Sequence, residues 1–167
     1  MDKKQLLEWV YEEIDFKDGE LKDGKITWKN IFEAEHVVYA KDIAYQDDKL
    51  AWYENNEVGL DLLKLKINKN FVLEWKVQTN TMGFSYGGCQ LIDFCENYLI
   101  VIYIDKHGKT LVLINTDRLD MTRIHLNRYA LVDFNRDKLV IKNNKSEDAD
   151  FSVKFHSQTF TKETFNK

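Results

Sequence analysis

Two unbroken apolar runs, separated by a short polar turn, constrain the fold of this chain more than any other feature. They are Leu99–Ile104 and Leu111–Ile114, joined by Asp105–Lys109, which contains a glycine. Short runs rich in Val, Ile and Tyr predict strands, and a short link containing Gly predicts a hairpin. Strands that are apolar at every position are covered on both faces. We therefore expect this hairpin at the centre of the core.

The strands expected before this hairpin have a different pattern. In Leu63–Ile67 and Phe71–Val77, apolar and polar side chains alternate, which is typical of strands with one dry and one wet face. Short segments of this kind, separated by turns, predict an antiparallel β-meander over residues 20–156. Residues 157–167 are weakly patterned and are expected to form a fraying tail.

The start of the chain has helical spacing. Apolar residues recur every four positions from Leu6 to Ile14, which predicts one amphipathic helix within residues 1–18. Asp2 and Gln5 have the spacing of a capping box. The opposite face of this helix is acidic rather than basic, so the apolar stripe indicates packing on the sheet rather than on a membrane surface.

A short theme recurs along the chain. Ile43–Leu50, Ile92–Leu99 and Val132–Leu139 each hold an aromatic residue, four mostly polar residues and then a leucine. Ile14–Leu21 also fits, although it conflicts with the end of the expected helix. The aromatic and the leucine flank a tight turn, so both can face the core and fix the register of a hairpin.

The spacing of this theme leaves two architectures open. Its aromatic residues are 49 and 40 positions apart, which is in the range of a propeller blade. Three or four such blades make an unusually small propeller. The preferred prediction is therefore a mainly β fold in which one continuous antiparallel meander forms a sandwich or curled barrel, with propeller-like repeats as the runner-up.

Length and composition indicate one domain without a membrane span. A chain of 167 residues buries a substantial core as a single domain, here residues 1–167. The start lacks the apolar segment of a secretory signal, and no apolar run is long enough to cross a bilayer. Cys89 and Cys95 are too far apart on one strand to share a disulfide or a zinc ion. We expect a cytoplasmic protein with two buried free thiols.

Motifs that carry chemistry are missing. The sequence has no G-x-S-x-G, Walker A or G-x-G-x-x-G pattern. Its four histidines occur singly, without the spacing of metal ligands. A thiol enzyme built on Cys89 remains a minor alternative. We therefore predict no catalytic residue, no metal, no cofactor and no enzymatic activity.

Charge is unevenly distributed. The net charge is −4, but residues 1–66 hold sixteen acidic and ten basic side chains, whereas residues 67–167 hold twelve acidic and fourteen basic ones. This balance disfavours nucleic acid as a partner and suits a basic protein. The predicted partner-binding residues are Glu33, Glu35, Asp47, Asp48, Glu54, Glu57 and Asp61.

This acidic cluster, together with the strand theme that ends in Tyr103–Ile114, gives the chain a general resemblance to a known group. It resembles the immunity proteins of bacterial contact-dependent growth inhibition and related polymorphic-toxin systems. The resemblance implies a protein-interaction module that neutralises a cognate toxin by forming a stoichiometric complex. Its carboxylates would lie against a basic toxin domain, and complementary charge would speed the encounter.

The alternative function is a small-ligand-binding or enzymatic β-barrel. It requires an apolar pocket with convergent polar groups. The candidate aromatic walls are Trp52, Trp75, Tyr86, Phe94 and Tyr103, and the candidate polar groups are Asp93, His125 and Arg128.

Overall fold

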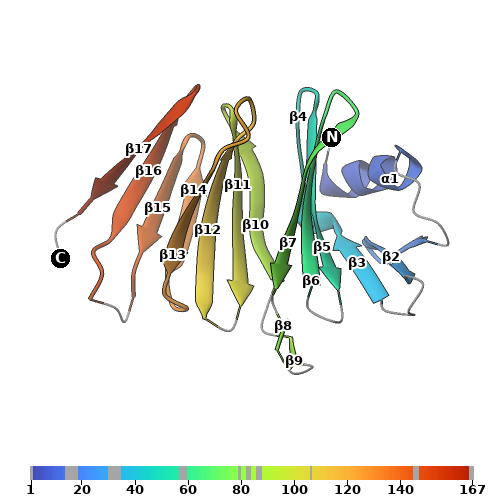
Figure 1. Ribbon diagram of the computed structural model, residues 1–167, viewed down its shortest axis with the longest axis horizontal. Helices are drawn as coiled ribbons and strands as arrows, with labels where there is room; N and C mark the ends of the chain where they lie inside the picture. Colours follow the sequence, from blue (N-terminus) through green and yellow to red (C-terminus); the bar gives the residue numbers. More distant parts are fainter. Residues whose placement is uncertain are drawn as a thin grey trace.

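The fold is mainly β, with one helix at the N-terminal end of the part that the structure describes (Figure 1). The computed structural model describes residues 2–13, 19–29, 35–56, 60–78, 80–81, 84–85, 88–105, 107–144 and 147–165. Helix α1 spans Lys3–Glu13. All strand pairs in the described residues are antiparallel, so the predicted fold class is confirmed.

The first sheet joins two groups of strands on β5. Its main unit, which we call blade 1, is β4 (Ile43–Gln46), β5 (Lys49–Asn56), β6 (Leu60–Ile67) and β7 (Asn70–Gln78). The same sheet also contains β1 (Glu20–Lys22), β2 (Lys25–Lys29) and β3 (Glu35–Tyr39). β3 and β4 share one edge of β5 and are linked by a short 3-10 helix, η1 (Ala40–Asp42).

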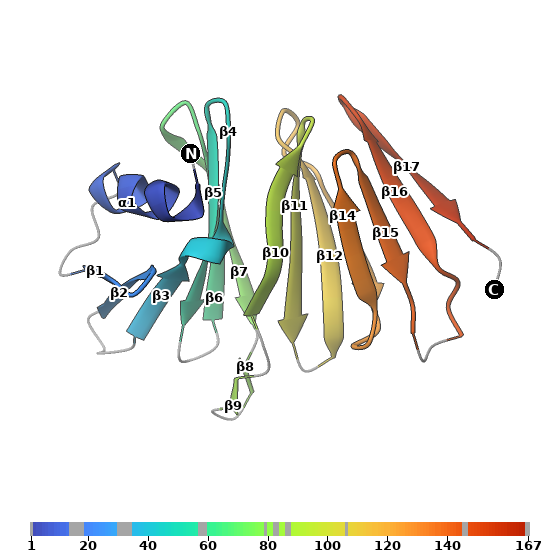
Figure 2. The same ribbon diagram turned by 180° about the vertical axis from the view of Figure 1, so that it is seen from behind.

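Two further four-stranded sheets follow. Blade 2 is β10 (Gly88–Cys95), β11 (Tyr98–Asp105), β12 (Gly108–Asn115) and β13 (Met121–Leu126). Blade 3 is β14 (Leu131–Asn135), β15 (Lys138–Lys142), β16 (Phe151–His156) and β17 (Thr159–Thr164). A small hairpin of β8 (Asn80–Thr81) and β9 (Phe84–Ser85) lies between blades 1 and 2 (Figure 2).

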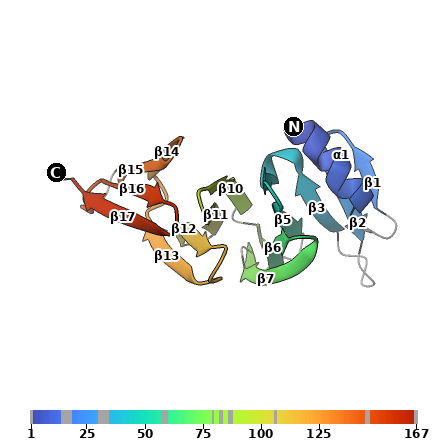
Figure 3. The ribbon, with the colours of Figure 1, turned by 90° about the horizontal axis from the view of Figure 1, so that it is seen from above.

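The layers follow the order of the chain: α1, blade 1, blade 2, blade 3 (Figure 3). One apolar cluster joins α1 to blade 1, a second joins blade 1 to blade 2, and a third joins blade 2 to blade 3. The meander is therefore divided into separate sheets that stack face to face. This arrangement corresponds to the runner-up, propeller-like repeats, rather than to one sandwich or curled barrel.

The central hairpin has the environment that its sequence predicts. Strand β11 is buried from Tyr98 to Tyr103, and all residues of β12 are buried. Val101 and Val112 face the cluster shared with blade 1, whereas Ile102 and Leu111 face the cluster shared with blade 3. Blade 2 is thus covered on both faces, which explains why these strands are apolar at every position.

The recurring theme forms the first hairpin of each blade. Tyr45 pairs across the strands with Leu50, Phe94 with Leu99, and Phe134 with Leu139. Each turn has two residues, and the first of them has a positive φ: 56° at Asp47, 51° at Glu96 and 60° at Arg136. The theme therefore specifies strand register. The fourth candidate, Ile14–Leu21, lies largely outside the described residues.

The expected capping box is present in α1. The Gln5 backbone N–H donates to Asp2 Oδ1 at 2.8 Å, and the Asp2 N–H donates to Gln5 Oε1 at 2.9 Å. Leu6, Leu7 and Val10 are buried against blade 1. The helix therefore covers one face of blade 1, as its apolar stripe predicts, and the part of the predicted helix over residues 14–18 lies outside the described residues.

The expected tail belongs to the fold, so the prediction for residues 157–167 is wrong over most of its length. Strand β17 pairs with β16 along its whole length, with Phe160 opposite Phe155. The Phe160 ring also packs edge-on against Tyr98 of blade 2 at 5.5 Å. The turn at Ser157-Gln158 and this aromatic contact fix the register of β17 on β16, which the weak alternation of apolar and polar residues in β17 does not specify.

Candidate functional site

The seven predicted partner-binding residues separate into three groups. Glu33 and Glu57 lie outside the described residues. Glu35, Asp47 and Asp48 are exposed, with Glu35 at the start of β3 opposite Lys29. Glu54 and Asp61 are buried, each with 2% of its surface exposed. The structure therefore leaves Asp47 and Asp48 as the two adjacent members of the set that reach solvent.

Glu54 does not belong to an acidic surface, contrary to the sequence-based prediction. Its Oε1 atom accepts a hydrogen bond from Trp52 Nε1 at 3.0 Å and lies 2.9 Å from Lys64 Nζ. These side chains share the face of β5 and β6 that lies toward α1. A buried carboxylate needs such partners, so Glu54 belongs to the interior of blade 1 and is not presented to a partner protein.

Asp61 is also part of the interior. Its Oδ2 atom accepts a hydrogen bond from the Tyr53 hydroxyl at 2.9 Å, and its Oδ1 atom accepts one from the Asn56 backbone N–H at 3.0 Å. Burial, together with the Asp61 carboxylate, raises the pKa of Tyr53 far above its usual range. Asp61 therefore connects two neighbouring strands and is not available to a partner.

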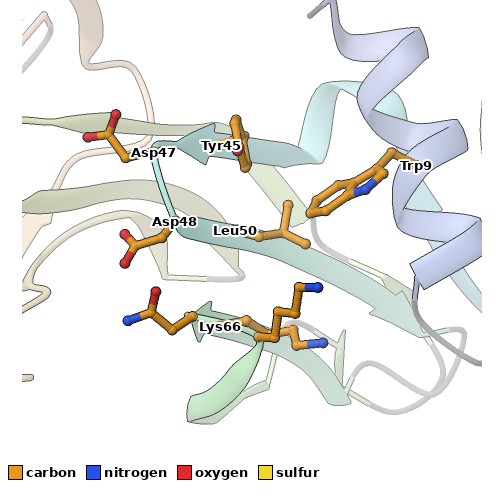
Figure 4. A pocket seen from close by; sticks show the side chains of 8 residues that line it. Trp9, Tyr45, Asp47, Asp48, Leu50 and Lys66 are labelled. Atoms are coloured by element: carbon orange, nitrogen blue, oxygen red, sulfur yellow. The ribbon is translucent and has the colours of Figure 1, made fainter.

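Asp47 and Asp48 form the turn between β4 and β5, at one end of a pocket of about 300 Å³ (Figure 4). A two-residue turn on a paired hairpin holds this pair of carboxylates in a defined place. Eight residues line the pocket: Trp9, Tyr45, Asp47, Asp48, Leu50, Lys66, Asn68 and Lys69.

Aromatic and apolar side chains form the interior of the pocket. Trp9 of α1 packs edge-on against Tyr45 of β4, with ring centroids 5.7 Å apart and an interplanar angle of 71°. Tyr45 keeps 46% of its surface exposed. Leu50 lies between Tyr45 and Lys66 in Figure 4, consistent with their positions on three neighbouring strands. A ligand in the pocket would therefore contact ring faces and an aliphatic floor.

The second turn at the pocket is basic. Asn68 and Lys69 connect β6 to β7 and have positive φ angles of 51° and 67°. The Asn68 backbone N–H donates to the Asp48 carbonyl at 3.1 Å, which ties the two turns together. Lys66 Nζ lies 4.7 Å from the centre of the Phe71 ring. The pocket thus combines two carboxylates with two ammonium groups.

These opposite charges do not neutralise one another directly. Ion pairs join Lys41 to Asp42, Lys64 to Glu54 and Arg118 to Asp120, but among the described residues none links Asp47 or Asp48 to Lys66 or Lys69. Aromatic surface beside accessible charges of both signs is suited to binding a charged side chain or a small dipolar molecule.

The alternative pocket predicted from the sequence is not assembled. Trp52, Phe94 and Tyr103 are buried in the apolar clusters, and Trp75 packs edge-on against Tyr103 at 5.8 Å. Tyr86 lies outside the described residues. Asp93 is on the first strand of blade 2 and His125 on the last; these strands are about 14 Å apart at the usual strand spacing, and the two residues are also offset along them. Arg128 follows β13 in a turn.

The buried thiols lack the environment of a nucleophile. Burial raises the pKa of Cys89 well above its ordinary value, and the nearby Asp42 carboxylate raises it further. Burial likewise raises the pKa of Cys95, to about 11. A catalytic thiol needs a lowered pKa, so the structure gives no support to a thiol enzyme. Both cysteines are free.

The described residues contain no group of three or more His, Cys, Asp or Glu side chains placed to hold a metal ion. They also contain no helix long and apolar enough to cross a membrane.

Sequence reasoning missed most of the pocket. Trp9 is next to Val10 in sequence and does not belong to the apolar stripe that predicted how the helix packs. Lys66 has the pattern of a polar strand position, and Asn68 and Lys69 have the pattern of an ordinary polar turn. The sequence held one signal in the first copy of the theme, which has a tyrosine, Tyr45, where the other two copies have Phe94 and Phe134. Its aromatic Tyr45 is exposed, whereas the equivalent Phe94 is buried.

Comparisons with known proteins add little about this site. No family model and no curated protein matches the chain. Among solved structures, it is similar to the β-propeller domain of the Trilobed protease from Pyrococcus furiosus, described as having an open velcro topology. The two share 12% sequence identity at a TM-score of 0.46, over 90% of this chain and 57% of that chain. The chain therefore spans less than two thirds of the matched structure.

Proposed function

We propose that this protein is a protein-interaction module that binds a basic protein partner in a stoichiometric complex, through the turn formed by Asp47 and Asp48. One observation carries this proposal: two adjacent exposed carboxylates lie on a hairpin turn beside an aromatic-walled pocket. Exposed acidic side chains attract a basic partner, and partly exposed aromatic rings provide anchors of the kind found at the centres of interfaces.

The specific form of this function that the sequence suggests is immunity. The partner would then be a basic toxin domain encoded beside this chain, and complex formation would block its active site or substrate groove. The resemblance to immunity proteins of contact-dependent growth inhibition supports this form, and so does the exposure of the acidic turn between β4 and β5. The expected location of such a complex is the bacterial cytoplasm.

Affinity capture with matched variants tests the proposal. Tagged wild-type protein, the double variant Asp47→Asn/Asp48→Asn and the control Glu147→Gln/Glu163→Gln are compared in lysate of the native host, at low and high salt. Both variants lose two negative charges, but Glu147 and Glu163 are exposed residues of blade 3, in the β15–β16 connection and on β17. The expected result is one basic polypeptide in near-equal amount, recovered by wild type and control and lost with the turn variant.

Purified components then separate binding from immunity. If the captured polypeptide is toxic or nucleolytic, and addition of one equivalent of this protein abolishes that activity, the immunity form is supported. If the partner binds but has no activity that this protein inhibits, the interaction module stands without the immunity role. Equal capture by all three proteins would contradict the role of the acidic turn.

A further inference from the structure

The pocket floor is a single cross-strand row. Tyr45 of β4 pairs with Leu50 of β5, Leu50 pairs with Lys66 of β6, and Lys66 pairs with Phe71 of β7. Neighbouring strands are about 4.8 Å apart, so the strands of Tyr45 and Lys66 are separated by about 10 Å. The row runs from an aromatic ring, across an aliphatic side chain, to an ammonium group.

The two ends of this row have opposite charge. Asp47 and Asp48 lie two and three residues beyond Tyr45, and Asn68 and Lys69 lie two and three residues beyond Lys66. A ligand with only a positive charge would be attracted by the two carboxylates and repelled by the two ammonium groups. A ligand with only a negative charge would be attracted by the ammonium groups and repelled by the carboxylates. A ligand that carries both charges, a few ångströms apart, satisfies both ends.

We infer that the pocket binds an arginine side chain of the partner together with an acidic side chain next to it in sequence. The guanidinium lies against Tyr45 and the Asp47/Asp48 turn, and the partner carboxylate lies against Lys66 and Lys69. This inference rests on the proposed function, because it names the part of a protein partner that the same site recognises.

Arginine fits this end of the pocket better than lysine. Its planar guanidinium stacks on aromatic rings and pairs with carboxylates through two parallel N–H donors, whereas a lysine ammonium is a compact and strongly hydrated charge. The Trp9 and Tyr45 rings meet edge to face, and Tyr45 is 46% exposed, so one aromatic surface is open to the incoming side chain. The pocket volume of about 300 Å³ accommodates one arginine side chain and a short neighbour.

Short peptides test this recognition without the partner. The probes are acetyl-Arg-Asp-amide, acetyl-Arg-Asn-amide, acetyl-Lys-Asp-amide and acetyl-citrulline-Asp-amide, titrated into the full chain labelled with ¹⁵N. Shifts of the Trp9 indole N–H and of the backbone amides of residues 45–50 report occupation of the pocket. We expect the Arg-Asp peptide to bind most tightly, with a loss of about three- to fivefold when either charge is removed.

Two variants show which side of the pocket binds the positive charge of the peptide and which binds the negative charge. Asp47→Asn/Asp48→Asn should abolish the preference for arginine over citrulline and keep the preference for Asp over Asn. Lys66→Gln/Lys69→Gln should do the opposite. Glu147→Gln/Glu163→Gln should change neither. Retained amide spectra of the folded chain confirm that each variant is intact.

The outcomes distinguish this inference from the proposed function. Equal affinity for all four peptides, or shifts at other tryptophans instead of Trp9, would overturn the inference. If partner capture still depended on Asp47 and Asp48 in that case, the proposed function would stand. If capture were independent of the two aspartates, the proposed function would fail whatever the peptides showed.

Discussion

Glu54 and Lys64 form an ion pair of 2.9 Å, with 2% of the Glu54 side chain and 20% of the Lys64 side chain exposed. Trp52 Nε1 donates to the same carboxylate oxygen. A carboxylate with two strong partners and almost no contact with water is a structural group. Glu54, which the sequence placed in an acidic partner-binding cluster, is therefore a residue that stabilises blade 1.

Removing this carboxylate should destabilise the fold. Glu54→Ala leaves the Trp52 N–H and the Lys64 ammonium without their buried acceptor, and we expect a loss of about 2 kcal/mol in the free energy of unfolding. Glu54→Gln keeps an acceptor for Trp52 and should lose less. Urea denaturation monitored by tryptophan fluorescence measures both. A change below about 0.5 kcal/mol for Glu54→Ala would show that the pair is solvated.

The stability effect of Asp42 should depend on pH. Its side chain is 1% exposed, and burial raises its pKa above 3.8, although Lys41 and Asn55 oppose the shift. The native state therefore favours the protonated form. The stability that Asp42 contributes in its protonated form is complete below the pKa of this carboxyl group in the unfolded chain. It is lost as the pH rises through the higher pKa of Asp42 in the folded protein.

Asp42→Asn provides the measurement for this pH effect. The amide is neutral at every pH, so the stability of the variant relative to wild type should increase between pH 3 and pH 7. Asp133→Asn, at an exposed position in blade 3, serves as the control. A difference that stays constant or falls with pH would show that the Lys41 ion pair at 2.7 Å outweighs burial.

Glycine at the first turn residue of a theme hairpin should stabilise the protein. Arg136 has a φ of 60°, a left-handed conformation that costs a residue with a side chain roughly 1 kcal/mol. We expect Arg136→Gly to raise the free energy of unfolding by about 0.5 kcal/mol, after the extra entropy of the unfolded chain is subtracted. Asp137→Gly, at the second turn residue, is the matched control and should not stabilise. Thermal unfolding of both variants measures the difference.

The two thiols should resist alkylation in the native state. With a pKa of about 11, about one Cys95 thiol in a thousand is ionised at pH 8, and both sulfur atoms are buried. Iodoacetamide at pH 8 should leave the intact mass unchanged over an hour, and both cysteines should react in urea. Rapid modification of Cys89 in the native protein would instead indicate a reactive thiolate.

Local features of the fold could be predicted because they depend on residues close in sequence. The register of three hairpins followed from an aromatic residue and a leucine on either side of a turn, as in Phe94 and Leu99. The Asp2–Gln5 capping box and the buried central hairpin are likewise local patterns. The spacing of the theme left both blades and one continuous meander open, and no local pattern decided between them, because the division into blades depends on where long-range packing interrupts the pairing.

The candidate site was predictable only in part. Asp47 and Asp48 were expected to face a partner, and they lie on an exposed turn. Trp9 reaches the same place through the packing of α1 on blade 1, which no local pattern specifies. Glu54 and Asp61 were misplaced because strand alternation shows that a residue lies on one face, but not that both faces of the strand are covered.

The stacking of the layers limits how far a local change can spread. Each apolar cluster is shared by two neighbouring layers, and no cluster in the described residues connects α1 directly with blade 3. The energetics therefore resemble those of a linear repeat array, in which each unit depends on its immediate neighbours. A substitution in the last blade can loosen that blade while the pocket beside α1 keeps its geometry, so the two ends of the molecule can diverge in sequence independently of one another.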